Sequence, residues 1–117
     1  MSEQKYIIEK PSSHPDVVVI RFGKQIMGGV EAMEFSAIIN DLSASAIRCL
    51  IVDMSEVDFI NSSGLGMLVN GLSSLSKYEI LLKLTSLPEK VMNLLKMTHL
   101  NEVFSIYESI ENALESI

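Results

Sequence analysis

Short apolar runs and longer segments with helical spacing of apolar residues alternate strictly from residue 46 to the end of the chain. Strands are expected within residues 46–54, at 81–84 and at 103–107. Helices are expected to follow them, beginning at Asn61, near Ser86 and after Ser109. Strict alternation of strands and helices favours right-handed crossovers and parallel pairing. The sequence therefore predicts an α/β fold, in which a mixed, mainly parallel β-sheet is packed with about four helices.

The first part of the chain is expected to supply two more strands and the first helix. Residues 6–9 and 17–22 have the composition of strands, and the breaker-rich turn 11–16 between them is too short for a crossover helix. These two strands are therefore expected to be antiparallel neighbours. A helix should open at Gly28 and Gly29, with apolar positions that include Val30, Met33, Ala37, Ile38 and Leu42.

The last two helices carry their own boundary signals. Thr85 or Ser86 is expected to cap the third helix, with Pro88 in its first turn. Its inner stripe is expected to be Val91, Leu94, Leu95 and Thr98. His99 is expected to end this helix in a left-handed conformation, and Ser109 to cap the final helix.

Two serines, Ser62 and Ser63, stand where a buried-looking strand region gives way to an apolar helix. Asn61 is a good N-cap, because its side-chain oxygen can accept a hydrogen bond from an unpaired amide of the first turn. Ile60 and Leu65 then occupy the two positions of a hydrophobic staple. At such a helix start, backbone amides and the helix dipole favour negative charge. The two serines therefore occupy a position that can carry a phosphoryl group without melting the helix.

Composition narrows the classes of function. The chain has 117 residues, a formal net charge of −6 and an isoelectric point near 4.8, which argue against nucleic acid or an anionic membrane as the main partner. The single Cys49 excludes an internal disulfide and a cysteine-cluster metal site, and its apolar surroundings favour a packed, inert thiol. The segment 1–5 is polar, and no apolar run approaches the roughly 20 residues of a membrane span. A single domain over residues 1–117 in the cytoplasm is expected.

Catalysis is not expected. Ser62, His99 and Asp53 formally supply a nucleophile, a base and an orienting acid, but no nucleophile-elbow pattern surrounds either serine. His14 and His99 are isolated, so neither a metal site nor a cofactor site is predicted. A paired-carboxylate role for Asp53 and Asp58 has no further support.

The motif around the two serines also carries a family resemblance. Residues 52–55 and 57–66 resemble the core motif of STAS domains, and most closely that of the small single-domain anti-sigma factor antagonists of bacteria. The later segments 94–104 and 109–114 look like the family's third helix with its last strand, and its last helix. In this family a partner kinase phosphorylates the first serine of the triplet, which the resemblance maps to Ser62. Two departures are visible: Asn61 stands where the family usually has Asp, and the segment 23–27 lacks the acid of a common Gly-x-Leu-Asp motif.

The resemblance implies a partner-switching function. The unphosphorylated protein would bind a serine-kinase anti-sigma factor, phosphorylation of Ser62 would end that binding, and a PP2C-type phosphatase would restore it. No cofactor is implied, and the protein alone is expected to be a monomer. The implied partner-binding residues are Asn61, Ser62, Ser63, Gly64, Leu65, Gly66 and Met67. Asn70 and Ser74 would extend this surface, whereas Met67 could equally fill core space.

Two other interpretations stay open at this point. Asn and Ser are common at ordinary helix starts, so the local pattern by itself does not separate a recognition site from a plain cap. A STAS domain could also act as a constitutive, unphosphorylated interaction module in a transporter or sensory complex. Asn61 keeps this second interpretation open, because a neutral amide preserves the cap but removes a carboxylate that a kinase could contact.

Overall fold

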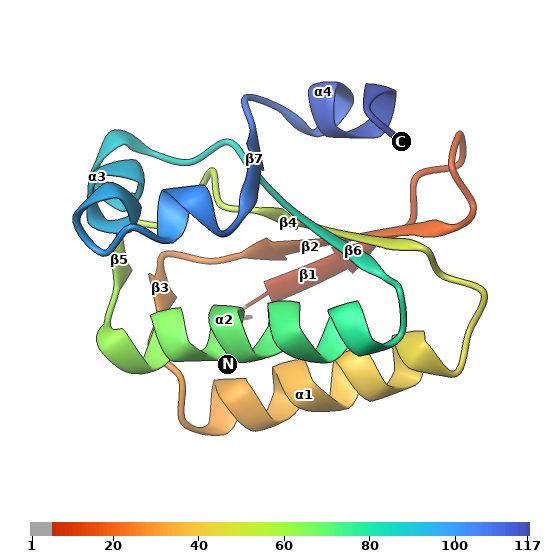
Figure 1. Cartoon of the computed structure of the whole chain (residues 1–117), viewed down its shortest axis with the longest axis horizontal. Helices are drawn as coiled ribbons and strands as arrows, with labels where there is room; N and C mark the ends of the chain where they lie inside the picture. The colour runs from red at the N-terminus through yellow and green to blue at the C-terminus, as the bar shows by residue number, and fades with distance from the viewer. Residues whose placement is uncertain (1–5) are drawn as a thin grey trace, which may run out of the picture.

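The computed structural model describes residues 6–117, and the polar segment 1–5 lies outside the described residues. The chain folds into an α/β structure with a mainly parallel sheet, as the alternation of elements predicted (Figure 1). Its elements are β1 (Tyr6–Glu9), β2 (Val17–Phe22), β3 (Gln25–Ile26), α1 (Val30–Ser43), β4 (Cys49–Asp53), β5 (Phe59–Ile60), α2 (Ser62–Lys77), β6 (Leu81–Thr85), α3 (Glu89–Met97), the 3-10 helix η1 (Leu100–Glu102), β7 (Ser105–Tyr107) and α4 (Ile110–Glu115).

Five strands form the main sheet in the order β1-β2-β4-β6-β7. β1 runs antiparallel to β2, which confirms the predicted hairpin, and the other neighbouring pairs are parallel. Helices connect the parallel strands, as a parallel sheet requires. The sheet thus places the carboxyl ends of β2, β4 and β6 at one edge.

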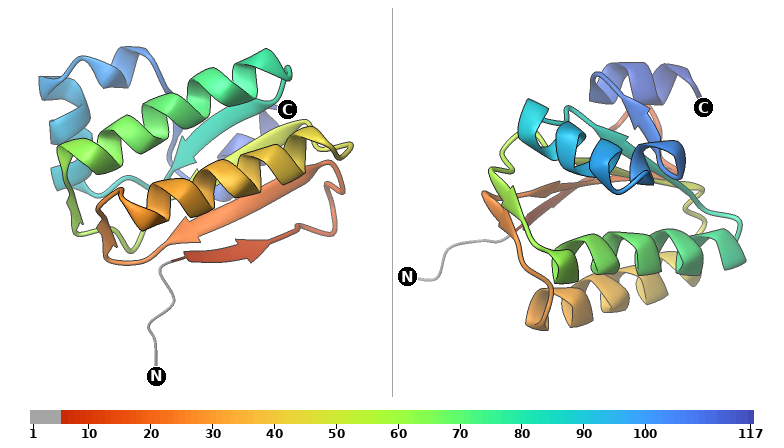
Figure 2. Two further views of the ribbon diagram at one scale, coloured as in Figure 1. Left: turned by 90° about the horizontal axis from the view of Figure 1, so that it is seen from below. Right: turned by 60° about the vertical axis from the view of Figure 1, so that its left-hand side comes forward.

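Helices cover both faces of this sheet. α1 and α2 lie side by side on one face, and the short α4 lies on the other (Figures 1 and 2). All five residues of β4 are buried because both faces are covered. Leu50 and Val52 belong to the large core under α1 and α2, whereas Cys49 and Ile51 belong to a smaller cluster with Ala113 of α4. The central strand therefore divides its side chains between two cores, as its continuous apolar sequence indicated.

A second, two-stranded sheet was not predicted. β3 pairs in parallel with β5, with Gln25 opposite Phe59 and Ile26 opposite Ile60. The carbonyl oxygen of Lys24 accepts hydrogen bonds from the amides of Asp58 and Phe59. Two-residue strands carry no readable alternation, so only the pairing of distant segments reveals them. This small sheet joins the segment before α1 to the segment before α2.

The predicted apolar face of α1 is partly wrong. Leu42 is buried as expected, but Val30 and Met33 are 66% and 72% exposed. The helix instead buries Glu31, Phe35, Ile39 and Leu42, which follow each other at spacings of four, four and three. Apolar residues lie on several sides of this helix, and contact with α2 and the sheet selects the stripe that contains Phe35.

The predicted start of α3 is also wrong. The cap position is occupied by Pro88, which provides no side-chain hydrogen bond, while Thr85 is buried in β6 and Ser86 has a positive φ of 59°. Thr98, expected on the inner stripe, is exposed, whereas Val91 and Leu95 are buried. Burial of the end of β6 takes Thr85 out of reach of the helix.

The boundary signals near the end of the chain are confirmed. His99 follows α3 with φ of 61° and ψ of 14°, a left-handed conformation. The hydroxyl of Ser109 accepts a hydrogen bond from the amide of Asn112 at 3.0 Å and caps α4. Among residues 6–117, no helix has both the length and the apolar character needed to cross a bilayer.

Candidate functional site

The start of α2 has the cap that the sequence predicted. Asn61 is extended, with φ of −96° and ψ of 179°, and its Oδ1 accepts a hydrogen bond from the amide of Gly64 at 2.7 Å. Ile60 and Leu65, the predicted staple positions, are both buried in the main core. Ser62 is the first helical residue, and both Ser62 and Ser63 are exposed.

The segment before α1 lies directly against this helix start. The carbonyl oxygen of Ile26 accepts a hydrogen bond from the amide of Asn61 at 3.3 Å. A Cβ on Gly64 would collide with the same carbonyl group. A Cβ on Gly28 would lie 2.7 Å from Cβ of Ser63 and 3.0 Å from its backbone carbonyl. Glycine is therefore required on both sides of this contact, because any side chain would push the two segments apart.

Four exposed apolar side chains lie on the segments that lead into α1 and α2 or on the first turns of α1. Met27 precedes Gly28, Val30 and Met33 lie in the first turns of α1, and Phe59 belongs to β5, which leads into α2. They are 45%, 66%, 72% and 49% exposed, respectively. We refer to Met27, Val30, Met33 and Phe59 as the apolar rim. Exposed apolar side chains on neighbouring segments are candidates for a protein interaction surface.

The predicted partner-binding residues differ in accessibility. Ser62 and Ser63 are exposed, and Asn61 and Gly66 are half-buried. Gly64, Leu65 and Met67 are buried, and Met67 is only 4% exposed. The expectation that Met67 extends an exposed surface is therefore wrong, and its side chain belongs to the main core. The apolar rim, which lies mostly outside the motif, was not predicted, and two of its members, Val30 and Met33, were expected among the apolar positions of the first helix.

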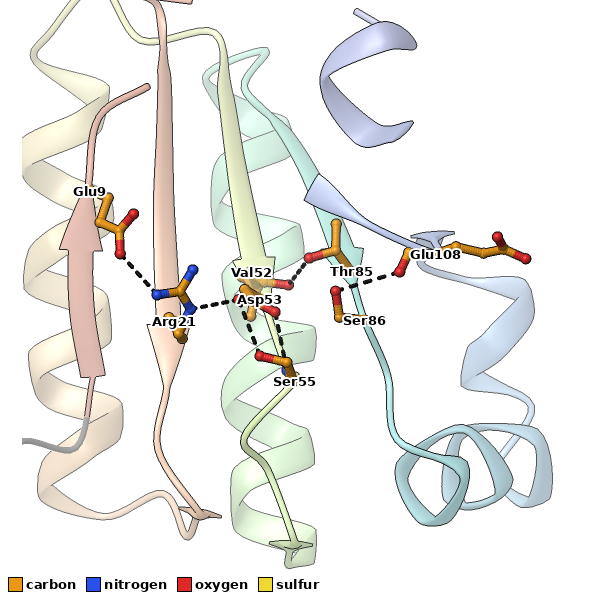
Figure 3. A network of polar contacts seen from close by, with 8 residues as sticks. All are labelled: Glu9, Arg21, Val52, Asp53, Ser55, Thr85, Ser86 and Glu108. Atoms are coloured by element: carbon orange, nitrogen blue, oxygen red, sulfur yellow. Dashed lines mark hydrogen bonds and ion pairs between the residues drawn. The ribbon is translucent and has the colours of Figure 1, made fainter. Parts of the chain in front are cut away.

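A polar network fixes the exit of the chain from β4 (Figure 3). Nε of Arg21 donates to Oδ2 of Asp53 at 2.6 Å, and Nη1 of the same side chain donates to Oε1 of Glu9 at 3.0 Å. Asp53 also accepts hydrogen bonds from the amide of Ser55 at 3.1 Å and from its hydroxyl at 3.3 Å. The hydrogen bond from Arg21 to Asp53 raises the pKa of the guanidinium. Asp53 therefore holds the turn that leads from β4 to β5 and the serines.

The two side chains considered as triad partners of Ser62 have other partners. Asp53 is engaged with Arg21 and Ser55, and His99 lies 3.7 Å from the carboxylate of Glu102 on an exposed turn. Within residues 6–117, no hydrogen bond connects either side chain to Ser62. That part of the chain also contains no group of three or more His, Cys, Asp or Glu side chains arranged to hold a metal ion.

Cys49 lies in the smaller hydrophobic cluster, which also contains Ala113 of α4. Cys49 is fully buried, and burial raises the pKa of its thiol to about 11 despite the opposing effect of Lys83. This confirms that the thiol is packed, and its lack of reactivity stays a prediction. Nζ of Lys83 donates to the hydroxyl of Tyr107 at 2.9 Å, which lowers the pKa of that phenol.

The sequence and the fold of this chain are similar to those of known proteins. Two Thermotoga proteins named as anti-sigma factor antagonists are similar in sequence: one from Thermotoga maritima is 38% identical over 64 residues, and one from Thermotoga neapolitana is 35% identical over 68 residues. These matches cover 55% and 58% of this chain, and 57% and 60% of the relatives' own lengths. A crystal structure of an anti-sigma factor antagonist from Thermotoga maritima superposes with a TM-score of 0.80 at 27% identity, covering 96% of this chain and 93% of that one. The family model described as the STAS domain matches residues 10–113. The chain belongs to the STAS domain family.

Proposed function

We propose that this protein is an anti-sigma factor antagonist that binds a serine-kinase anti-sigma factor through the start of α2 and the apolar rim. The main support is the position of Ser62, an exposed hydroxyl in the first turn of α2, beside the segment that leads into α1. Family membership and the names of the relatives support the same role. The protein itself performs no catalysis in this scheme, and the ATP belongs to the kinase.

Phosphorylation of Ser62 is the proposed control step. A phosphoserine adds about −1.5 to −2 charges, and at a helix start it can accept hydrogen bonds from backbone amides. Asn61 already satisfies the amide of Gly64, so the amides of Ser62 and Ser63 are the ones that a helix start leaves for an anion. In favourable geometry this arrangement stabilises the charge by up to about 2 kcal/mol. The modified protein therefore stays folded.

The same charge opposes binding of the partner. An uncompensated charge buried at an interface costs about 3–5 kcal/mol, and each 1.4 kcal/mol is about a tenfold change in affinity. Phosphorylation would thus weaken binding more than about a hundredfold without unfolding either protein. A PP2C-type phosphatase would return the chain, as a monomer in the cytoplasm, to its binding state.

The test combines phosphopeptide mass spectrometry on the protein from its native cells with binding measurements. The anti-sigma factor that co-purifies with the protein serves as the probe, and its binding to the wild type, Ser62→Ala and Ser62→Glu is measured by calorimetry. Ser63→Glu asks whether the first serine alone matters, and Ser73→Glu places the same charge on an exposed position farther along α2.

The proposal predicts reversible phosphate on Ser62, tight binding by Ser62→Ala, and binding by Ser62→Glu that is weaker than that of Ser73→Glu. An unmodified Ser62 in growth and stress, together with a stable partner, would instead indicate a constitutive interaction module.

A further inference from the structure

Glu31, in the first turn of α1, is an unusual buried carboxylate. It is 3% exposed, and Asp53 is the other acidic side chain that is buried among the described residues. Asp53 is paired with Arg21, but Glu31 has no cationic partner in this part of the chain. Its Oε1 accepts a hydrogen bond from the amide of Met27 at 3.0 Å, while its Oε2 is buried without a partner among residues 6–117. Burying a carboxylate with an unsatisfied oxygen costs free energy, and the bond to the amide of Met27 offsets part of that cost.

That hydrogen bond closes the loop between β3 and α1. The loop contains Gly28 and Gly29 with φ of 78° and 63°, so it turns through conformations that other residues adopt only with strain. Glu31 reaches back over this turn to the amide of Met27, four residues earlier. A capping box works in a similar way, with an acidic side chain of the first turn bonding an amide upstream of the helix. Here the bond fixes the whole glycine turn and not the cap residue alone.

The fixed turn is the part of the chain that touches the serines. Gly28 is in contact with Ser63, where even a Cβ would not fit. Ile26, just before the turn, lies under Gly64. Met27, at the bonded amide, is itself part of the apolar rim. The position of the glycine turn therefore sets where Met27 lies beside the helix start.

We propose that Glu31 is a positioning residue of the recognition surface: its carboxylate holds the turn 27–29 against Ser63, so that Met27 of the apolar rim is correctly placed for a protein partner. This inference rests on the proposed function for the identity of the partner. The role depends on a hydrogen-bond acceptor at the right reach and not on the negative charge.

Two conservative variants separate reach from charge. Glu31→Gln loses the charge but keeps an oxygen at the same distance for the amide of Met27. Glu31→Asp keeps the charge but is one methylene too short. Glu34→Gln is the matched control, because it removes a charge from the same helix at a half-buried position that bonds the hydroxyl of Tyr6. Nitrogen–proton correlation spectra and amide hydrogen exchange report the turn directly, and binding of the co-purified anti-sigma factor reports recognition.

The expected result is that Glu31→Asp shifts the amide resonances of Met27, Gly28 and Ser63, speeds exchange at Met27 at least tenfold, and weakens partner binding at least tenfold. Glu31→Gln and Glu34→Gln should stay within about twofold of the wild type in both measurements. The positioning role would be overturned if the amide resonances of Glu31→Asp were unchanged, or if Glu31→Gln altered the amides and the binding as much as Glu31→Asp does. It would also be overturned if the amide resonances of Glu31→Asp moved while its affinity for the partner stayed the same. The amide measurement needs no partner: a wild type that binds no anti-sigma factor contradicts the proposed function, while the spectra still decide whether Glu31 holds the turn.

Discussion

Nε of Arg21 lies 2.6 Å from Oδ2 of Asp53, and the two residues face each other in the register of β2 and β4. The Asp53 side chain is 4% exposed and that of Arg21 is 33% exposed. Asp53 also bonds Ser55, so one carboxylate ties the second strand to the turn that leads toward the serines. Asp53, which lies in the motif segment 52–55, therefore has a structural role in this chain.

Asp53→Asn is expected to lower the free energy of unfolding by about 1.5–3 kcal/mol, the range for hydrogen bonds to charged groups. The loss arises because the amide that replaces Asp53 has one accepting oxygen and no charge, so it cannot make the charge-assisted bond to Arg21 and also serve both groups of Ser55. Urea unfolding measures the change. Glu9→Gln is the control, since exposed ion pairs contribute only about 0–1 kcal/mol. Equal losses in the two variants would contradict the assignment of Asp53 as the central member.

Gly64→Ala is expected to destabilise the protein by about 1–3 kcal/mol, as overpacking of a close contact does. The new Cβ would collide with the carbonyl group of Ile26. Gly66→Ala, two residues later, meets nothing within 4 Å and should stabilise the helix by roughly 0.5–1 kcal/mol. Urea unfolding of both variants should therefore give changes of opposite sign, and changes of the same sign would refute the predicted contact.

Asn61→Ala is expected to cost about 1 kcal/mol, because the amide of Gly64 loses its side-chain partner. Asn61→Asp keeps an accepting oxygen and adds a charge that the helix dipole favours, by about 0.3–1 kcal/mol at low salt. Thermal and urea unfolding test this order. If Asn61→Asp proves as unstable as Asn61→Ala, the neutral amide has a role other than capping.

Met33→Ser is expected to change the free energy of unfolding by less than about 0.5 kcal/mol, as surface substitutions usually do. Binding of the co-purified anti-sigma factor should weaken about ten- to a hundredfold, since burying such a side chain contributes about 1.5–3 kcal/mol. Met97→Ser is the matched control: Met97 is 80% exposed at the end of α3 and does not belong to the apolar rim. Equal binding by the two variants would remove the apolar rim from the recognition surface.

The thiol of Cys49 predicts a dependence of stability on alkaline pH. Burial raises its pKa from 9.0 to about 11 in the folded protein. Above pH 9 the unfolded chain loses this proton before the folded one, so the free energy of unfolding falls as pH rises, by at most about 1.4 kcal/mol per pH unit, up to about pH 11.

Urea unfolding at pH 8 to 11 checks this expectation, with Cys49→Ala as the reference for other groups that titrate there. The wild type should lose more stability over this range than the variant does. Parallel losses in the two proteins would show that the thiol does not contribute. The folded wild type should also resist thiol reagents at pH 8 until it is unfolded.

Local sequence was sufficient for the boundaries of several elements. Asn61 and Ser109 cap their helices and His99 ends α3 in a left-handed turn, as predicted. These features depend on hydrogen bonds and backbone preferences within about four residues, so the neighbouring sequence contains the needed information. The mainly parallel pairing of the sheet was also predictable, because strict alternation of strands and helices leaves few other connections.

Tertiary structure alone decided which side chains the candidate site displays. Glu31 is buried while Val30 and Met33 are exposed, although apolar patterning predicts the reverse, and Met67 is buried although it seemed available to a partner. The rotation of a helix about its axis is set by the distant segments that it packs against. The pairing of β3 with β5 likewise joins residues more than 30 positions apart. The sequence by itself determined the fold and the position of the serines in the chain, whereas long-range packing decided the surface around them, because burial depends on neighbours that local patterns do not specify.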